Sequence, residues 1–507
     1  MNNLFKKLLL LFFIHFSFFT FLSASTLNLS MSSSPSRLNP ILANDSASSE
    51  ISDWLFNGLF KYDKNGGITT DLAKSYTFES DTKLVIHLQK NVLWHDGAKF
   101  TARDVVFTYN TIISPNIFTS IASSYQKVDK VIALDDYTVA ITYKEPYFKA
   151  LEIWMVGMIP HHILKDDKDL MKSKFNKKPI GTGAYKLESF KNSSDIKLFA
   201  NDNYFKGRPK IDEINYKFLP DPTTSFLMLK QNKLDLGNLT PLQIDRQIND
   251  EFKKEYQIIE QQSFGYTYLG FNLRNEKFKN KNVRLALSLA IDRQELVDVL
   301  YFGHAKICNG PFLPGSFAFN EEVKAPNQDL KKAKMLLEKA GYNNNNPLEF
   351  EVVTNTGNDI RINAAEIMQY QLAKIGVKMK IRVMEWQAFL NTIVFPRDFE
   401  AVVLGWGLGL TPDAYSIWHG NSDKKGAFNF VGYHNKEVDA LIDKGAITVD
   451  RKKLGVIYKK IYKLISADVP YLFLYVPNSI QVVSRDIKNI EPAFVGITHN
   501  QKDWVKP

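Results

Sequence analysis

The chain has 507 residues, of which 45% are hydrophobic and 23% charged, the composition of an ordinary globular protein. Its formal charge is +10, but the lysines are scattered, which argues against nucleic acid as a partner. The single cysteine, Cys308, excludes an intramolecular disulfide, and we expect it to be buried. A chain of this length exceeds what one core usually holds, so two or three domains are expected.

The N-terminus predicts a secretory signal peptide. Lys6 and Lys7 precede an uncharged apolar run from Leu8 to Phe21, and small residues suitable for cleavage follow. The run is shorter than the roughly 20 residues that a membrane-spanning helix needs, so an uncleaved anchor is the weaker alternative. Because no cysteine stands near the cleavage region, no lipid anchor is expected. Removal of residues 1–24 would leave a periplasmic chain with a formal charge of +8.

Residues 73–110 predict a strand, a turn and a helix in succession. Apolar side chains alternate over 84–89, the period of a strand with one face more buried than the other. A turn follows at 96–97, and Thr and Asp at the ends of 101–104 resemble a capping box at the start of a helix. Pro115 is expected to end that helix.

The second half of the chain alternates helical and strand patterns. The spacing predicts a helix over 330–340, a strand over 348–352, a helix over 364–375 and a strand over 377–383. A strand, a helix and a strand at this spacing imply parallel pairing with a right-handed crossover. The predicted fold class is therefore α/β.

The segment Val-Leu-Trp-His-Asp-Gly, followed by Lys-Phe-Thr-Ala-Arg-Asp-Val-Val-Phe, resembles the signature of a bacterial family. These are the extracellular solute-binding proteins of family 5, which serve dipeptide, oligopeptide and nickel ABC importers. Residues 179–185, 268–272 and 282–293 also resemble family segments, so the resemblance extends over nearly the whole mature chain.

The resemblance implies a two-lobed periplasmic binding protein of type II, in the large cluster C form, with a hinge of two crossover strands. The first lobe would have an extra subdomain. The implied boundaries are 25–57, 178–262 and 481–507 for the core of the first lobe, 58–177 for its extra subdomain, and 263–480 for the second lobe.

Gly405 and Trp406 begin a glycine-rich segment that follows an apolar strand pattern. The segment lacks the Lys-Ser/Thr of a phosphate-binding loop and resembles the Gly-Trp segment that lines the cleft in peptide-binding members. Those members commonly place an aspartate three residues after the Trp, where it pairs with the ligand's α-ammonium; this chain has Gly409. Either Asp413 takes that role, or the ligand has no free amino terminus here, since a buried unpaired ammonium is costly.

Arg361 matches a position from which some dipeptide- and nickel-binding members contact a ligand carboxylate. A planar guanidinium suits this role because it can donate two parallel hydrogen bonds to one carboxylate. The alternative is an arginine that faces solvent on a helix. Further candidates near the inferred cleft, each of which could instead be core, are Tyr266, Trp386, Trp418 and His419. Ser34 could hydrogen-bond a ligand backbone, or could simply form a turn.

Two histidine motifs invite a metal or acid–base interpretation. His161-His162 and His95-Asp96 lack the spacing of a metalloprotease and stand beside no nucleophile motif, so we interpret both as structural. No catalytic residue, resident metal or cofactor is expected.

The first hypothesis is a monomeric binding protein that closes on a short peptide and presents it to an inner-membrane ABC permease. The second keeps the fold but changes the ligand to a nickel chelate such as nickel-histidine, held by Arg361, with His419, His434 or His499 as an axial ligand. A periplasmic hydrolase is a weaker third, because Asp413 and Glu385 lack an identifiable catalytic partner.

Overall fold

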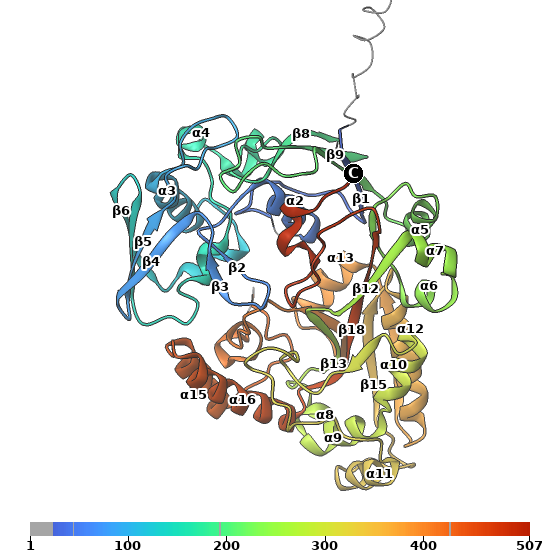
Figure 1. Cartoon of the computed structure of the whole chain (residues 1–507). Helices are drawn as coiled ribbons and strands as arrows, with labels where there is room; N and C mark the ends of the chain where they lie inside the picture. The colour runs from blue at the N-terminus through green and yellow to red at the C-terminus, as the bar shows by residue number, and fades with distance from the viewer. Residues whose placement is uncertain (1–23, 44, 192–193, 425–426) are drawn as a thin grey trace, which may run out of the picture.

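The computed structural model describes residues 24–43, 45–191, 194–424 and 427–507. Apart from Ala24, the predicted signal peptide therefore lies outside the described residues. The chain folds into two lobes (Figure 1). We call the part built on two four-stranded sheets the first lobe, and the part built around strands β13, β17, β15 and β16 the second lobe.

The first of these four-stranded sheets has the order β1-β10-β9-β8, in which only the β1–β10 pair is parallel. Its strands are β1 (Thr26–Met31), β8 (Tyr185–Lys191), β9 (Asp195–Ala200) and β10 (Glu213–Phe218). Helix α2 (Ser46–Leu55) packs on this sheet, and the indole Nε1 of Trp54 donates to the hydroxyl of Tyr216 at 2.9 Å.

The other sheet of the first lobe is antiparallel, with the order β4-β5-β7-β6. Its strands are β4 (Ala73–Ser80), β5 (Lys83–Leu88), β6 (Val128–Asp135) and β7 (Thr138–Tyr143), with the hairpin of β2 (Phe60–Tyr62) and β3 (Ile68–Thr70) beside it. The predicted strand, turn and helix are confirmed, the helix being α3 (Ala102–Ile112). The expected alternation is incomplete, because Val85 is also buried.

The sheet of the second lobe confirms the predicted α/β order. Strands β17, β15 and β16 run parallel, and β13 pairs antiparallel with β17. Their bounds are β13 (Gly265–Phe271), β15 (Glu349–Asn355), β16 (Lys378–Met384) and β17 (Ala401–Gly407). Helix α12 (Asp359–Ala373) begins before the predicted apolar stripe and contains Arg361 in its first turn, as expected; the side chain of Asn358 caps it by accepting from the amide of Arg361.

The long strand β18 (Tyr471–Ser484) belongs to both halves of the molecule. Its first part pairs with β13 and β14 (Ala305–Ile307), and its second part pairs with β12 (Tyr256–Gln262) and β11 (Leu236–Asn238). The chain thus passes between the lobes along β18 and between β12 and β13. The boundaries at 262/263 and 480/481, which remain predictions, fall near these passages.

Helix α12 lies against β15 and β16 on one side of the second lobe (Figure 1). The second lobe carries α8 (Glu276–Lys279), α9 (Lys281–Ala290), α10 (Arg293–Tyr301), α11 (Leu330–Lys339), α13 (Trp386–Phe389), α14 (Tyr415–Trp418), α15 (Lys436–Ala446) and α16 (Arg451–Asp468). The other helices are α4 (His161–Leu164), α5 (Pro222–Lys230), α6 (Pro241–Arg246) and α7 (Asp250–Glu255). Cys308 is buried, as expected, and burial raises the pKa of its thiol to about 12.

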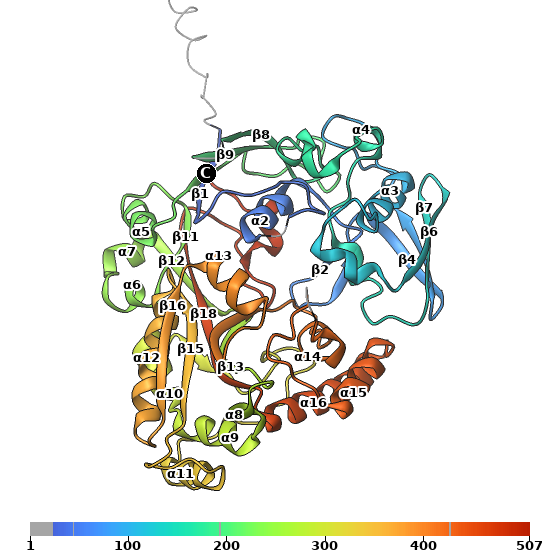
Figure 2. The same cartoon turned by 180° about the vertical axis from the view of Figure 1, so that it is seen from behind.

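Among the described residues, no helix combines the length and apolar character that crossing a membrane requires. Figure 2 shows α14 on the side of the second lobe that faces β2 of the first lobe. The loop that follows β17 leads to this place, so residues from both lobes meet here.

Candidate functional site

A cavity of about 420 Å³ lies where the two lobes meet. The first lobe contributes Lys149 and Glu152, and the C-terminal segment after β18 contributes Phe494. The second lobe supplies most of the wall, namely Phe264, Pro311, Phe312, Leu313, Pro314, Ser316, residues 406–413, Ser416, Ile417, Trp418 and Phe428. Aromatic and proline side chains dominate this wall, and Lys149, Glu152 and Asp413 are its only charged members among the described residues.

Strand β17 brings Trp406 to the cavity. The indole ring stacks on Phe430, with 5.6 Å between centroids, and lies parallel to Tyr268 at 6.3 Å. Its Nε1 donates to the hydroxyl of Tyr471 at 3.4 Å. These contacts hold the ring in one orientation, so that it presents a preformed apolar surface to a ligand.

Gly405 makes room for the guanidinium of Arg361. A Cβ atom at Gly405 would lie 2.9 Å from Nη2 of Arg361, closer than van der Waals contact allows. Nη1 of Arg361 donates to Oδ1 of Asn355 at 3.1 Å, and burial lowers the pKa of the guanidinium. No carboxylate within the described ranges forms an ion pair with Arg361, and the residue is not part of the cavity wall. The guanidinium therefore retains donors for an anionic group.

Asp413 forms an ion pair across the two lobes. Its Oδ2 lies 2.9 Å from Nζ of Lys149, whose side chain is only 14% exposed, and its Oδ1 accepts from the amide of Tyr415 at 3.0 Å. Gly409 lies on the same loop, where an added Cβ would have only the carbonyl oxygen of Thr411 nearby, at 3.7 Å. The loop therefore has room for a side chain at 409 but carries its one carboxylate at 413.

Two residues that the sequence suggested as ligand contacts are almost fully buried. Tyr266 is 2% exposed and does not line the cavity; its ring contacts Tyr268 and Phe473, and its hydroxyl has no hydrogen-bond partner in the described part of the chain. Trp418 is 1% exposed but does form part of the cavity wall. Its ring packs on Tyr471, with 4.7 Å between centroids.

Three other predicted residues lie away from the cavity wall. Nδ1 of His419 accepts from the amide of Asn421 at 3.0 Å, and its Nε2 faces Asp443 at 3.4 Å. Trp386, at the start of α13, is 38% exposed, and Ser34 is half-buried in the loop after β1. The cavity thus collects Trp406, Gly409, Asp413 and Trp418 from the predicted set.

Sequence reasoning missed Lys149, Glu152 and Phe494. Lys149 and Asp413 stand 264 positions apart, so no local pattern indicates that they meet. Phe264 could have been suspected, because it immediately precedes the strand that carries Tyr266. Glu385, one of the two carboxylates considered for hydrolysis, accepts from the amide of Ala388 at the start of α13 and is not part of the cavity wall.

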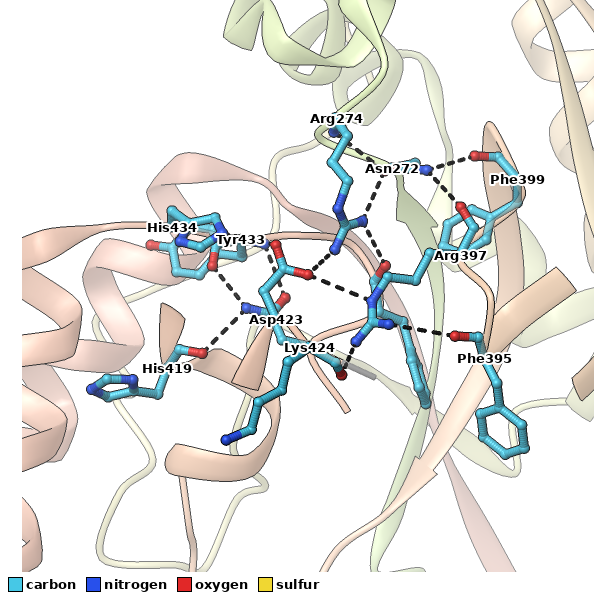
Figure 3. Close-up of polar contacts among 12 residues, drawn as sticks. Asn272, Arg274, Phe395, Arg397, Phe399, His419, Asp423, Lys424, Tyr433 and His434 are labelled. Atoms are coloured by element: carbon cyan, nitrogen blue, oxygen red, sulfur yellow. Dashed lines mark hydrogen bonds and ion pairs between the residues drawn. The ribbon is translucent and has the colours of Figure 1, made fainter. Parts of the chain in front are cut away.

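The histidines considered as metal ligands each have a protein partner. Nε2 of His434 lies 2.8 Å from Oδ2 of Asp423, which also pairs with Arg274 (Figure 3). Partial burial alone would raise the pKa of Asp423, but hydrogen bonds from His434 and Arg274 lower it. Nε2 of His499 lies 2.9 Å from the carbonyl oxygen of Glu491. Within the described ranges, no group of three or more His, Cys, Asp or Glu side chains could hold a metal ion.

His95 and its neighbours connect the turn at 96–97 to residues 181–183. The amide of Gly181 donates to Nδ1 of His95 at 3.1 Å, so Nε2 carries the proton and donates to the carbonyl of Gly183 at 3.1 Å. Burial lowers the pKa of His95 to about 4, which keeps the ring neutral. His162 pairs with Asp96 at 2.8 Å. These contacts are structural and lie outside the cavity wall.

Two lobes joined by long strands, with an aromatic cavity between them, define a solute-binding protein of the periplasmic type. The sequence profile for the middle region of the bacterial extracellular solute-binding proteins, family 5, matches residues 67–428. The chain belongs to this family of extracellular solute-binding proteins.

Two relatives illustrate the range of this family. The oligopeptide-binding protein AppA of Bacillus subtilis is 34% identical over 90% of this chain and 89% of its own length. The structure of AppA in complex with a nonapeptide matches with a TM-score of 0.82 at 31% identity, covering 96% of this chain and 100% of that one. NikZ of Campylobacter jejuni, in complex with Ni(L-His), matches with a TM-score of 0.84 at 30% identity, with the same coverage.

Proposed function

We propose that this protein captures short peptides between its lobes in the periplasm and delivers them to an inner-membrane ABC permease. The observation that carries the proposal is the cavity, because residues 406–413, Trp406 among them, line it and both lobes contribute to its wall. Its volume of about 420 Å³ lies within the roughly 300–1,000 Å³ of small-ligand sites, which suits a peptide of a few residues. Similarity to AppA supports this choice of ligand.

Closure of the lobes provides the mechanism. Three contacts join the lobes beside the cavity: Lys149 with Asp413, the hydroxyls of Tyr62 and Thr411 at 3.3 Å, and the amide of Phe148 with the carbonyl of Ala446 at 3.2 Å. A ligand that contacts both lobes favours this closed state over an open one, and the permease recognises the closed state. We place the mature protein, cleaved after residue 24 and without a lipid, in the periplasm as a monomer.

The proposal is tested by thermal unfolding of the purified protein in the presence of di- to tetrapeptide libraries. A ligand-dependent rise in the unfolding temperature is expected, because binding stabilises only the folded state. Native mass spectrometry of protein purified without added ligand would identify any peptide that it retains. No shift with any peptide, together with a shift from another class of solute, would overturn the proposal.

A nickel chelate is a second candidate, favoured by Arg361, which has no carboxylate partner among the described residues. A guanidinium can hold the carboxylate of a chelator such as histidine without any bond between protein and metal. Similarity to NikZ supports this alternative. Calorimetric titration with nickel plus L-histidine decides it, since the absence of binding heat from the mixture removes this candidate.

A further inference from the structure

The cavity wall carries two acidic residues and one basic residue among the described residues, so its charges do not cancel. Lys149 and Asp413 neutralise each other across the lobes at 2.9 Å. Glu152 is the third charged residue of the wall, and within the described ranges it forms no ion pair with any basic side chain. One negative charge therefore remains in a cavity whose wall is mostly apolar.

One carboxylate oxygen of Glu152 lacks a partner. Oε2 is buried, and no described residue makes a hydrogen bond to it. The hydroxyl of Tyr62 lies close to this carboxylate: burial, the charge of Glu152 and a hydrogen bond to Glu152 all raise the pKa of Tyr62. A buried carboxylate oxygen without a donor costs free energy unless a ligand supplies one.

Asp413 is poorly placed to receive a ligand ammonium. Lys149 already occupies it, and the amide of Tyr415 holds its other oxygen. If a ligand cation displaced Lys149 from Asp413, the largely buried ammonium of Lys149 would lose its counter-ion. Glu152 offers a carboxylate in the same cavity without that cost.

We infer that Glu152, and not Asp413, receives the cationic group of the ligand, while Lys149 serves as a tethered ammonium that satisfies Asp413 when the lobes close. The inference rests on the proposed function and narrows it to ligands with a free amino terminus or another cation at this end. It also provides the carboxylate that the loop lacks at Gly409.

The test compares Glu152→Gln with the wild type. A mixed tripeptide library and the same library after N-acetylation are offered to each protein, and the bound fraction is measured by mass spectrometry. The wild type should bind the free-amino library better than the acetylated one. In Glu152→Gln this preference should be about tenfold smaller, while acetylated peptides still bind. Glu145→Gln, which removes an exposed carboxylate in the same segment, is the matched control and should behave as wild type.

Asp413→Asn provides the contrasting variant. Because it disrupts closure and not recognition of the ammonium, it should weaken binding of both libraries to a similar extent. The inference is overturned if Glu152→Gln binds both libraries as wild type does, if wild type shows no preference, or if Asp413→Asn alone abolishes the preference. Unfolding temperatures of all variants separate lost recognition from lost folding. Wild-type protein that binds neither library overturns the proposed function itself.

Discussion

Gly405 has no side chain, and the space this leaves is taken by the guanidinium of Arg361. Gly405 lies on a strand between two neighbours, where β-branched or aromatic residues are usually favoured. The nearest atom to a Cβ at this position belongs to the Arg361 guanidinium, at 2.9 Å. Glycine at this position therefore leaves space for the approach of a side chain, and the backbone conformation does not call for glycine.

Replacement of Gly405 by alanine should weaken ligand binding more than folding. The methyl group displaces the flexible end of Arg361, so we expect about a tenfold loss of affinity with a small change in unfolding temperature. Calorimetry with nickel plus L-histidine, the candidate ligand assigned to Arg361, measures the first effect, and thermal unfolding measures the second. Arg361→Ala should reproduce the loss, whereas Arg382→Ala, which removes a partly exposed arginine from β16, should not. Wild-type affinity in Gly405→Ala would contradict the assigned role of Arg361.

The neutral ring of His95 predicts a loss of stability in acid. Its pKa of about 4 in the folded protein lies below the ordinary value of 6.5, so the unfolded chain takes up the proton first. The stability that His95 contributes is complete above pH 6.5 and falls by up to about 3 kcal/mol as the pH approaches 4. Urea unfolding between pH 7 and 4 should show a shallower decline for His95→Gln, and His87→Gln, at an exposed position on β5, should retain the wild-type slope.

At the scale of elements, Asp104 connects the start of α3 to α4. Its Oδ2 accepts from the amide of Thr101 at 2.8 Å within the predicted capping box, which is confirmed, and its Oδ1 accepts from the amide of His161 at 2.9 Å. The residue is buried, so both amides would lose their partner without gaining water. One side chain thus positions two elements of the first lobe.

Asp104→Ala should lower the free energy of unfolding by about 1–3 kcal/mol, because it leaves two partly buried amides without their acceptors. Chemical denaturation measures the change. Arg103→Ala, at the neighbouring exposed position of α3, is the control and should change stability by less than about 0.5 kcal/mol. An equal effect of the two substitutions would show that Asp104 does not join the elements as described.

At the scale of the whole molecule, contacts between the lobes set the balance between open and closed states. The ion pair of Lys149 with Asp413 lies at the cavity, where its side chains are 14% and 38% exposed. A pair that is partly shielded from water contributes more than an exposed one, and it exists only while the lobes are closed. The free energy of closure therefore depends on this pair as well as on the ligand.

Lys149→Met should shift the ligand-free protein toward the open state and weaken binding by about threefold to tenfold. Small-angle scattering would detect the shift as a larger radius of gyration, and peptide titration would follow the affinity. The double exchange Lys149→Asp with Asp413→Lys should recover part of the closed population. Lys144→Met removes an exposed lysine of the same segment and should have no effect. Unchanged scattering in Lys149→Met would exclude a role for the pair in closure.

The sequence by itself determined the local elements and the α/β order, because side-chain period, capping and turn residues act over a few positions. It also pointed to the segment at 405–413, from which Trp406, Gly409 and Asp413 line the cavity. Only the tertiary structure decided the charge of the cavity, since Lys149 and Glu152 of the first lobe join Asp413 of the second lobe in its wall. Pairing between such distant residues depends on how the lobes close, and no local pattern encodes it.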